Sequence, residues 1–366
     1  MRRLLSVLFA FVMVVCTCFA EAEKPKETSY SVLVFGDVHF DSKSFRKSMD
    51  GLSKNRLKEL ERNIAKWEPD ESATIPNMLR DAGKLSSTTA FGVQLGDISQ
   101  GDCGSAELQK KAFAAVLEKM SLVRPKTKEE WQFFPVKGNH DIRGDGAADA
   151  YNEVMLPYLE KQFREKCPVA GRADFALMHG PDLYIFFDSI GAGEKDLLFV
   201  EAALAKHGDA RHVFFLTHLP VLPVSRGGVF WIVFEHKTQL RRRLLDMLAA
   251  RKTIVLAAHI HATTLATYSS AKGTITQFTS FSMPTAWKST VQFKKGDYTA
   301  DVKAAMEKHA KGHADELADF KESIGNYSFF SPGASYNLMR VADGQVTIER
   351  HAACGDNVQS IQLIEK

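Results

Sequence analysis

The residues best suited to chemistry in this chain are aspartate, asparagine and histidine side chains that directly follow short apolar runs. They form five groups: Asp-x-His, Gly-Asp, Gly-Asn-His-Asp, Thr-His and His-x-His. The set comprises Asp37, His39, Asp97, Asn139, His140, His218, His259 and His261. Carboxylate, amide and imidazole ligands together suit a hard-to-borderline divalent metal ion. The set is large enough for two ions that share one carboxylate.

Each group also has an ordinary structural explanation. An Asp-x-His tripeptide arises by chance in many chains, and Gly-Asp after a strand is a common turn. His-x-His at a strand end could be two surface histidines. Gly138-Asn139-His140-Asp141 is more specific, because four turn-forming or ionisable residues after an apolar run are poor core material. The order and spacing of all five groups together favour the metal-site interpretation.

The apolar runs that precede these groups predict strands. We expect strands at residues 31–35, 90–95, 131–136, 175–179, 183–188, 212–216, 253–257, 265–268, 274–281, 336–341 and 346–349. Helical patterns occur at residues 45–67, 108–120, 197–206, 239–251 and 300–320. Strands that alternate with helices and are then followed by further strands predict an α/β sandwich with mixed sheets. Ligands of α/β sheets bind at the carboxyl ends of the strands, where the five groups fall.

In the order and spacing of these five groups, the chain resembles the calcineurin-like metallophosphoesterase family. The matching motifs are Gly36-Asp37-Val38-His39, Gly96-Asp97, Gly138-Asn139-His140-Asp141, Thr217-His218 and His259-Ile260-His261. The resemblance implies a four-layer α/β/β/α sandwich, in which helices flank two mixed β-sheets and a dinuclear metal site lies at the strand ends. We expect one phosphoesterase domain over residues 30–350, with the C-terminal strands, to about residue 364, packed on it.

The resemblance also implies a role for each site residue. Asp37, His39 and His261 would hold one divalent ion, and Asn139, His218 and His259 would hold the other. Asp97 would bridge the two ions. His140 would stand over the substrate phosphate, oriented by Asp141, and both count as catalytic. The ligand set suits manganese, iron or zinc.

Two positions depart from the family pattern. Ala258 stands before His259 where the family usually has glycine, which removes backbone freedom but no ligand. Gln100 occupies the position, three after Asp97, where purple acid phosphatases place a tyrosine ligand, which argues against that ferric subgroup.

The implied activity is hydrolysis of phosphoric mono- or diesters by a metal-bridging hydroxide, with a small-molecule phosphoester as substrate. A secreted nuclease or a phospholipid-headgroup phosphodiesterase on the same scaffold is the alternative. The chain has 47 Lys and Arg against 44 Asp and Glu, so a net charge of +3 gives no reason to expect a nucleic-acid partner. A non-catalytic metal-binding protein ranks last, because no ligand is missing. Oligomeric state is left open.

The first 22 residues have the form of a secretory signal peptide. Arg2 and Arg3 precede an apolar run, and small residues lead into the charged segment that begins at Glu21. The run is short for a transmembrane helix, so we expect export to the periplasm, the outside of the cell or a secretory lumen, with no membrane span after cleavage. An uncleaved anchor is the alternative. Three cysteines, Cys103, Cys167 and Cys354, then remain, and their pairing is open.

Several residues outside the five groups admit two interpretations. Arg143 could contact the substrate phosphate or face solvent. Residues 219–223, 226–231 and 282–287 could form walls of the active site or packed loops. His309 and His313 are spaced as metal-binding pairs can be, but the pattern favours a solvated helix face.

Overall fold

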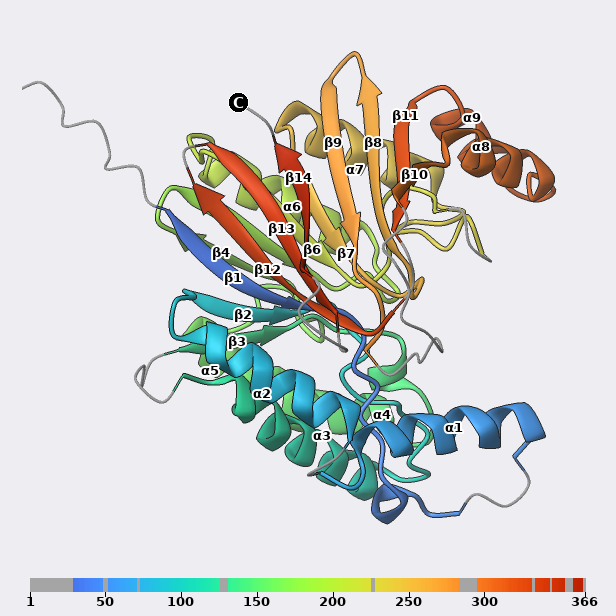
Figure 1. The fold of residues 1–366 in the computed structure, drawn as a ribbon. Coiled ribbons are helices and arrows are strands. Elements are labelled where there is room, and N and C mark those ends of the chain that lie inside the picture. Colours follow the sequence, from blue (N-terminus) through green and yellow to red (C-terminus); the bar gives the residue numbers. More distant parts are fainter. Residues whose placement is uncertain are drawn as a thin grey trace, which may run out of the picture.

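Two mixed β-sheets form the centre of the molecule (Figure 1). The computed structural model describes residues 29–48, 52–70, 73–125, 131–224, 228–283, 295–330, 333–342, 344–352 and 358–364. The six-stranded sheet has the order β14-β13-β12-β1-β2-β3, and the eight-stranded sheet has the order β10-β11-β8-β9-β7-β6-β5-β4. In the first, β1 is parallel to β2 and antiparallel to β12, so C-terminal strands complete a sheet that the N-terminal strand begins.

The strands of the first sheet are β1 (Tyr30–Phe35), β2 (Phe91–Gln94), β3 (Gln132–Pro135), β12 (Ser335–Ala342), β13 (Gln345–Ala352) and β14 (Val358–Ile364). Those of the second are β4 (Phe175–His179), β5 (Asp182–Phe187), β6 (Val213–Thr217), β7 (Ile254–Ala257), β8 (Thr263–Ser270), β9 (Gly273–Thr279), β10 (Lys295–Asp297) and β11 (Ile324–Phe330). The helices are α1 (Lys54–Trp67), α2 (Thr74–Ser86), α3 (Ala106–Met120), α4 (Ala147–Ala150), α5 (Leu156–Phe163), α6 (Glu194–Lys206), α7 (Thr238–Ala250), α8 (Thr299–Lys308) and α9 (Ala314–Phe320).

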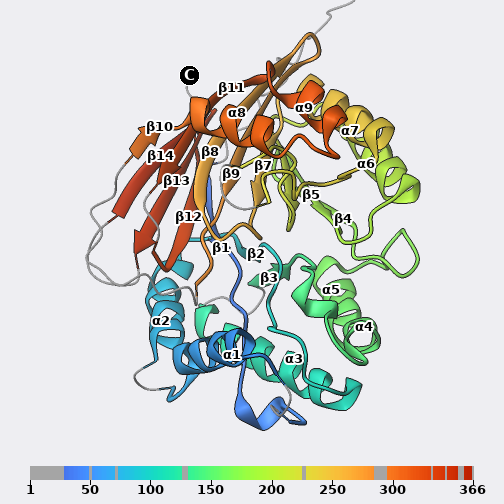
Figure 2. The ribbon, with the colours of Figure 1, turned by 90° about the vertical axis from the view of Figure 1, so that its right-hand side faces the viewer.

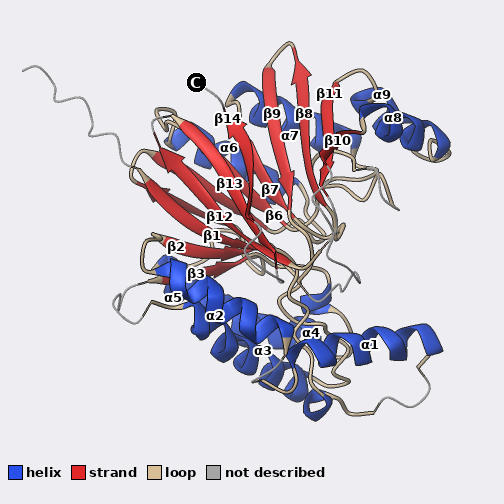
Figure 3. Cartoon of the chain, viewed as in Figure 1, coloured by secondary structure: helices blue, strands red, loops and turns tan. Residues whose placement is uncertain are grey.

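Helices cover the outer face of each sheet, which gives the expected four layers (Figures 2 and 3). Alternation along β5 shows how the layers are joined, since successive side chains of a strand point to opposite faces. Tyr184 stacks edge-on against Phe91 of the other sheet, with ring centroids 5.2 Å apart. Leu183 and Ile185 point the other way and belong to a second core together with Leu197 of α6. The α/β/β/α sandwich is therefore confirmed.

Two of the expected helices differ from the structure at their ends. The helix predicted from residue 45 begins only at Lys54, where the Ser53 side chain accepts a hydrogen bond from the backbone N–H of Arg56 and caps it. The single helix predicted over residues 300–320 is wrong. It is two helices, α8 and α9, because Gly312 between them adopts a left-handed φ of 83° that a continuous helix excludes.

The predictions for the N-terminus and the cysteines fall partly outside the described residues. Residues 1–22, the predicted signal peptide, lie outside the described residues, as does Cys354. Cys103 and Cys167 are free and do not pair with each other. Within the described parts of the chain, no helix combines the length and apolar character needed to cross a membrane.

Candidate metal centre

The predicted site residues meet where the parallel strands of both sheets end. Asp37 and His39 follow β1, Asp97 follows β2, and the Asn139 segment follows β3. From the second sheet, His218 follows β6, and the His259 and His261 pair follows β7. All of the predicted residues, Asp37, His39, Asp97, Asn139, His140, Asp141, His218, His259 and His261, are thus brought to one end of the sandwich. Their binding of metal stays a prediction.

The loops that carry the ligands have unusual backbone conformations. His39, Asp97, His259 and His261 adopt positive φ angles of 43°, 57°, 66° and 51°. Such conformations are unfavourable for residues other than glycine and concentrate at functional sites. The preceding Gly96 is required on two counts, since its φ is 92° and a Cβ would lie 2.4 Å from Nδ1 of His218. The glycine of the Gly-Asp motif is therefore needed because the ring of His218 packs directly against it.

Asp37, His39 and His261 form the first group of candidate ligands. Nε2 of His261 lies 3.0 Å from Oδ2 of Asp37 and 3.1 Å from Nε2 of His39. The Asp37 side chain is fully buried, and its Oδ2 atom accepts no hydrogen bond. A buried carboxylate oxygen without a hydrogen bond is costly. A divalent cation between these atoms would remove that cost.

His218, His259 and Asn139 form the second group. Nδ1 of His218 lies 2.8 Å from the carbonyl oxygen of Leu95, which can only accept, so Nδ1 carries the proton and the Nε2 atom is the available ligand. That Nε2 atom lies 3.0 Å from Oδ1 of Asn139 and 3.1 Å from Nδ1 of His259. Three donor atoms converge on one point, as the prediction requires.

Asp97 lies between the two groups. Its Oδ2 atom is 3.3 Å from Nε2 of His218 and 3.9 Å from Nε2 of His39. Its Oδ1 atom accepts a hydrogen bond of 2.7 Å from the backbone N–H of His140, which fixes the carboxylate. Asp97 therefore lies between the two groups, and its bridging of two ions stays a prediction.

The electrostatics of this cluster reflect a shortage of positive charge. Burial would raise the pKa of Asp97, but the neighbouring His218 outweighs it and holds the pKa well below its usual value. Burial lowers the pKa of His218, yet Asp97 and Asp37 overcome burial and raise it to about 9. Without a metal ion the Nε2 atom of His218 therefore also carries a proton, which a bound cation would displace. Burial and the adjacent His218 then lower the pKa of His259 to about 3. One protonated imidazole is thus what the chain itself offers against two buried carboxylates, so the donor set fits added cations.

His140 is held beside the cluster with its Nε2 atom toward Arg143. Its Nδ1 lies 2.9 Å from the carbonyl oxygen of Gln100, so Nδ1 is the protonated nitrogen. Its Nε2 accepts a hydrogen bond of 2.9 Å from the Arg143 guanidinium, which can only donate. Burial lowers the pKa of His140 below its usual value, consistent with this neutral form.

The expectation that Asp141 orients His140 is wrong. Its carboxylate instead accepts hydrogen bonds from the backbone N–H groups of Gly138, Asp97 and Ser99, at 2.8, 3.1 and 2.9 Å. Asp141 therefore ties the loop after β2 to the loop after β3. Those loops carry ligands, so its role is to position the backbone.

The backbone carbonyl of Gln100 is the hydrogen-bond partner of His140 that the sequence did not reveal. The side chain of Gln100 turns away from the cluster and bonds to Asn63 and Glu59 of α1. Its backbone carbonyl orients His140, and any residue type can supply a carbonyl, so no sequence signal marks it. The departure from the tyrosine-bearing pattern leaves Gln100 in a structural role.

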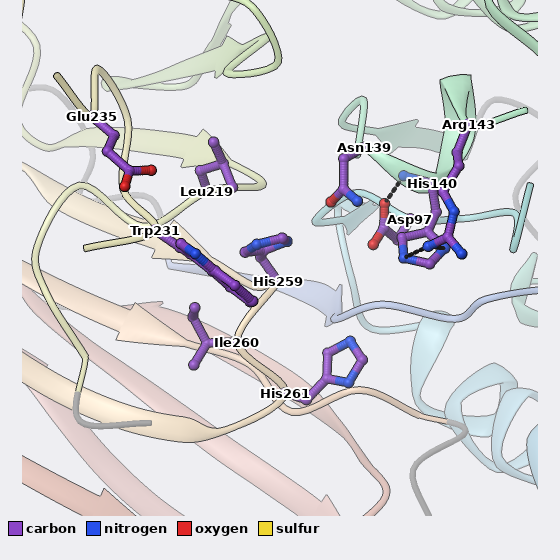
Figure 4. Close-up of a pocket in the computed structure, with 10 residues that line it drawn as sticks. All are labelled: Asp97, Asn139, His140, Arg143, Leu219, Trp231, Glu235, His259, Ile260 and His261. Atoms are coloured by element: carbon purple, nitrogen blue, oxygen red, sulfur yellow. Dashed lines mark hydrogen bonds between the residues drawn. The ribbon is translucent and has the colours of Figure 1, made fainter. Parts of the chain in front are cut away.

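A cavity of about 590 Å³ opens over the cluster (Figure 4). One side carries Asn139, His140 and Arg143, and the opposite side carries an apolar wall. That wall and its end are formed by Leu219, Trp231, Ile260 and Glu235. Arg143 is paired with Asp102, with Nε 2.9 Å from Oδ2, and lines the cavity with 36% of its side chain exposed.

The other predicted wall segments have mixed outcomes. Trp231 lines the cavity with 52% of its surface exposed, and its ring centroid lies 5.5 Å from that of His259. Met283 is buried behind Asp37, where its N–H bonds to the Asp37 carbonyl oxygen, so it does not close the site. Arg226 and residues 284–287 lie outside the described residues. Glu235 was not predicted, because an isolated glutamate has no distinguishing pattern.

A calcineurin-like phosphoesterase family model matches residues 30–263. The chain belongs to the calcineurin-like phosphoesterase family. Membership makes it a metal-dependent phosphoric ester hydrolase by class, as predicted, and agrees with the candidate ligand clusters at the strand ends. No curated protein sequence matches the chain significantly.

Solved structures with the same fold are distant in sequence. A purple acid phosphatase from yellow lupin (Lupinus luteus) seeds is 13% identical with a TM-score of 0.54 over 92% of this chain, which spans only 54% of the lupin chain. A dimetal phosphatase from Danio rerio is 11% identical with a TM-score of 0.52, covering 92% of this chain and 99% of its own. GAP50, the anchor in the inner membrane complex of Plasmodium, is 10% identical with a TM-score of 0.50, covering 92% and 90%. These likenesses support the fold.

Proposed function

We propose that this chain is an exported enzyme that hydrolyses small phosphoric esters with two divalent cations. The observation that carries the proposal is the pair of complete ligand groups on either side of Asp97, which lies within 4 Å of a histidine of each. Export is proposed from the signal-like sequence of residues 1–22. Manganese, iron and zinc all suit the donor set.

Two cations bound at these groups would supply a hydroxide nucleophile at neutral pH, bridging as the resemblance implies, and positive charge for the phosphate oxygens. The protein's own contribution is orientation. Asp141 fixes the two loops, and the Gln100 carbonyl fixes the ring of His140. Arg143, held by Asp102, faces the cavity where it can donate to a phosphate oxygen.

The cavity favours a small substrate with an apolar or aromatic leaving group. Its volume of about 590 Å³ is that of a small-molecule site. Trp231 and Leu219 stand across from Arg143, so an ester whose phosphate lies near Arg143 would direct its leaving group toward the apolar wall (Figure 4). A nuclease would need a long basic groove, which neither the net charge of +3 nor this wall suggests.

The test is hydrolysis of p-nitrophenyl phosphate and bis-p-nitrophenyl phosphate by the metal-stripped protein after addition of Mn²⁺, Fe²⁺ or Zn²⁺. Turnover that requires metal supports the proposal, and the ratio of the two rates separates monoester from diester preference. Bound metal without turnover of either ester, or of a nucleic acid or phospholipid, would favour a non-catalytic role.

A further inference from the structure

A further cluster of side chains that can bind metal lies at the rim of the cavity. It is separate from the predicted metal ligands at the strand ends, which we call the strand-end cluster: Asp37, His39, Asp97, Asn139, His218, His259 and His261. Glu235 and His236 precede α7, and His313 precedes α9. Their ligand atoms all lie within 4.8 Å of one another. Oε1 of Glu235 is 3.6 Å from Nε2 of His236 and 3.8 Å from Nε2 of His313. We call these three residues the rim cluster.

These distances are too long for hydrogen bonds and slightly longer than the spacing of ligand atoms in a metal site. Both exceed the length of a normal hydrogen bond, so the three polar groups face one another without pairing. In a tetrahedral zinc site with ligands at about 2.0–2.1 Å, the ligand atoms lie about 3.3–3.4 Å apart. A shift of a few tenths of an ångström would bring the carboxylate and each imidazole to that spacing. Two histidines and one glutamate are also a ligand set that Zn²⁺ takes in proteins.

The surroundings of His313 match those of a metal-bound imidazole. Its ring stacks on Phe230 and on His236, with centroids 4.7 Å away in each case. Because an imidazole binds a metal ion in the plane of its ring, His236, whose side chain is 61% exposed, has to turn out of this stack for both Nε2 atoms to reach one ion. Its Nδ1 atom is buried without a hydrogen bond and lies 3.8 Å from Oε2 of Glu316. A metal-bound histidine commonly donates its other N–H to a carboxylate, and Glu316 is the carboxylate beside this Nδ1 atom, although 3.8 Å is beyond hydrogen-bond length. Glu316 is itself buried and fixed by Arg241 at 2.7 Å.

The backbone of the rim cluster is held in an unfavourable conformation. Phe234 and His236 adopt left-handed φ angles of 59° and 60°. The N–H of His236 donates a hydrogen bond of 2.9 Å to Glu316, which ties the segment before α7 to α9. Left-handed residues other than glycine are uncommon and mark places where the surrounding structure enforces a geometry. The same feature distinguishes the ligand loops of the strand-end cluster.

We propose that Glu235, His236 and His313 form a separate Zn²⁺ site that fastens α9 to the wall of the substrate cavity. Glu235 lines that cavity, and Trp231 lies four residues before it on the same segment (Figure 4). Three protein ligands leave the fourth position of a tetrahedral ion to water. An ion at this position would hold the aromatic wall in place from outside the strand-end cluster.

Zinc stoichiometry of the metal-stripped full-length protein tests this site without any substrate, so the result does not depend on the proposed hydrolysis. With both clusters filled, we expect about three Zn²⁺ per wild-type chain after equilibrium dialysis. His313→Gln, and His236→Asn, whose asparagine tolerates the left-handed backbone, should each bind about two. His309→Gln, a change to the nearby histidine outside the cluster, is the matched control and should bind about three.

A fourth variant separates metal binding from packing. His313→Cys removes the stacked ring but supplies a thiolate, so it should again bind about three Zn²⁺, whereas a structural role for the ring would not be rescued. Circular dichroism verifies that each variant is folded. The proposal is overturned if folded His313→Gln binds as much zinc as the wild type, or if His309→Gln loses an ion as well.

Discussion

Among the buried carboxylates of the described residues, two groups differ in what neutralises them. Asp174 and Asp188 have no exposed surface, and Asp196 has 4%. Lys137 forms an ion pair with Asp188, while Nε of Arg172 lies 2.6 Å from Oδ1 of Asp196. Three carboxylates therefore share two fixed cations. Burial, then the neighbouring Asp196 and Asp188, raise the pKa of Asp174 to about 9, so one carboxyl is protonated and the charges balance.

The strand-end cluster has equally buried carboxylates but no such cations. Within the described residues, the ion-pair partners of Asp37 and Asp97 are all histidines. An unperturbed imidazole is mostly neutral at neutral pH, so it can bind a metal ion but does not balance the charge of a carboxylate. Where the chain supplies lysine and arginine, a buried carboxylate group is structural. Where it supplies imidazoles, a protonated His218 balances only part of the carboxylate charge, and bound cations would supply the rest and make the site available for chemistry.

Removal of Asp97 should therefore have the largest effect on activity. Asp97→Ala deletes the carboxylate that both ligand groups share, and we expect kcat/KM for p-nitrophenyl phosphate to fall by at least about 10³-fold. Asp81→Ala, which removes an exposed carboxylate of α2 paired with Lys84, should keep wild-type activity. Activity that survived in Asp97→Ala would place the chemistry outside the strand-end cluster.

Removal of Lys137, which pairs with the buried Asp188, should lower stability rather than activity. Lys137→Met removes the nearer of the two cations of Asp188 and leaves only Arg172, whose Nη2 lies 3.4 Å from Oδ1. We expect the free energy of unfolding to fall by about 3 kcal/mol in urea titrations of the metal-free protein. Lys84→Met, at a side chain that is 77% exposed, is the matched control and should change it by less than about 0.5 kcal/mol. Equal values for the two variants would mean that Lys137 does not neutralise its cluster.

His140 separates metal binding from catalysis within the strand-end cluster. The ring is fixed by the Gln100 carbonyl and Arg143, so His140→Ala should lower kcat roughly 10²-fold and leave the bound metal nearly unchanged. Metal content by atomic spectroscopy, read beside kcat, distinguishes the two roles. A variant that lost its metal ions would show His140 to be a ligand.

The strand-end cluster was predictable from the sequence because its members follow apolar strands at fixed points. Parallel strands bring their carboxyl ends together, so motifs as distant as Asp37 and His261 converge once the strands are recognised. The break between α8 and α9 was harder to predict. A glycine within a helical pattern is tolerated at a cost of about 1 kcal/mol relative to alanine, so Gly312 does not by itself mark the end of a helix.

The rim cluster shows where prediction from sequence fails. The spacing of His309 and His313 suggested one helix face, and His313 instead precedes α9 beside Glu235 and His236. That meeting depends on how α9 packs against the segment before α7, which no local pattern encodes. The error over Asp141 has the same origin, since its three partners are backbone N–H groups, which every non-proline residue carries.

The effect that is smallest per step of the measurement is the pH dependence of the structural carboxylates. Asp174 has a pKa of about 9 in the folded chain, against about 4 when unfolded. Its contribution to stability is therefore complete below about pH 4 and is lost as the pH rises toward 9. Asp174→Asn cannot ionise, so the wild type should lose up to about 1 kcal/mol per pH unit relative to this variant between pH 6 and 9. Urea titrations at each pH measure the difference, with Asp81→Asn as an exposed control. If the free energy of unfolding depended on pH in the same way for the wild type and Asp174→Asn, Asp174 would be ionised in the folded chain. Lys137 and Arg172 would then face three ionised carboxylates. The contrast with the strand-end cluster would in that case rest on the type of cation rather than on the balance of charge.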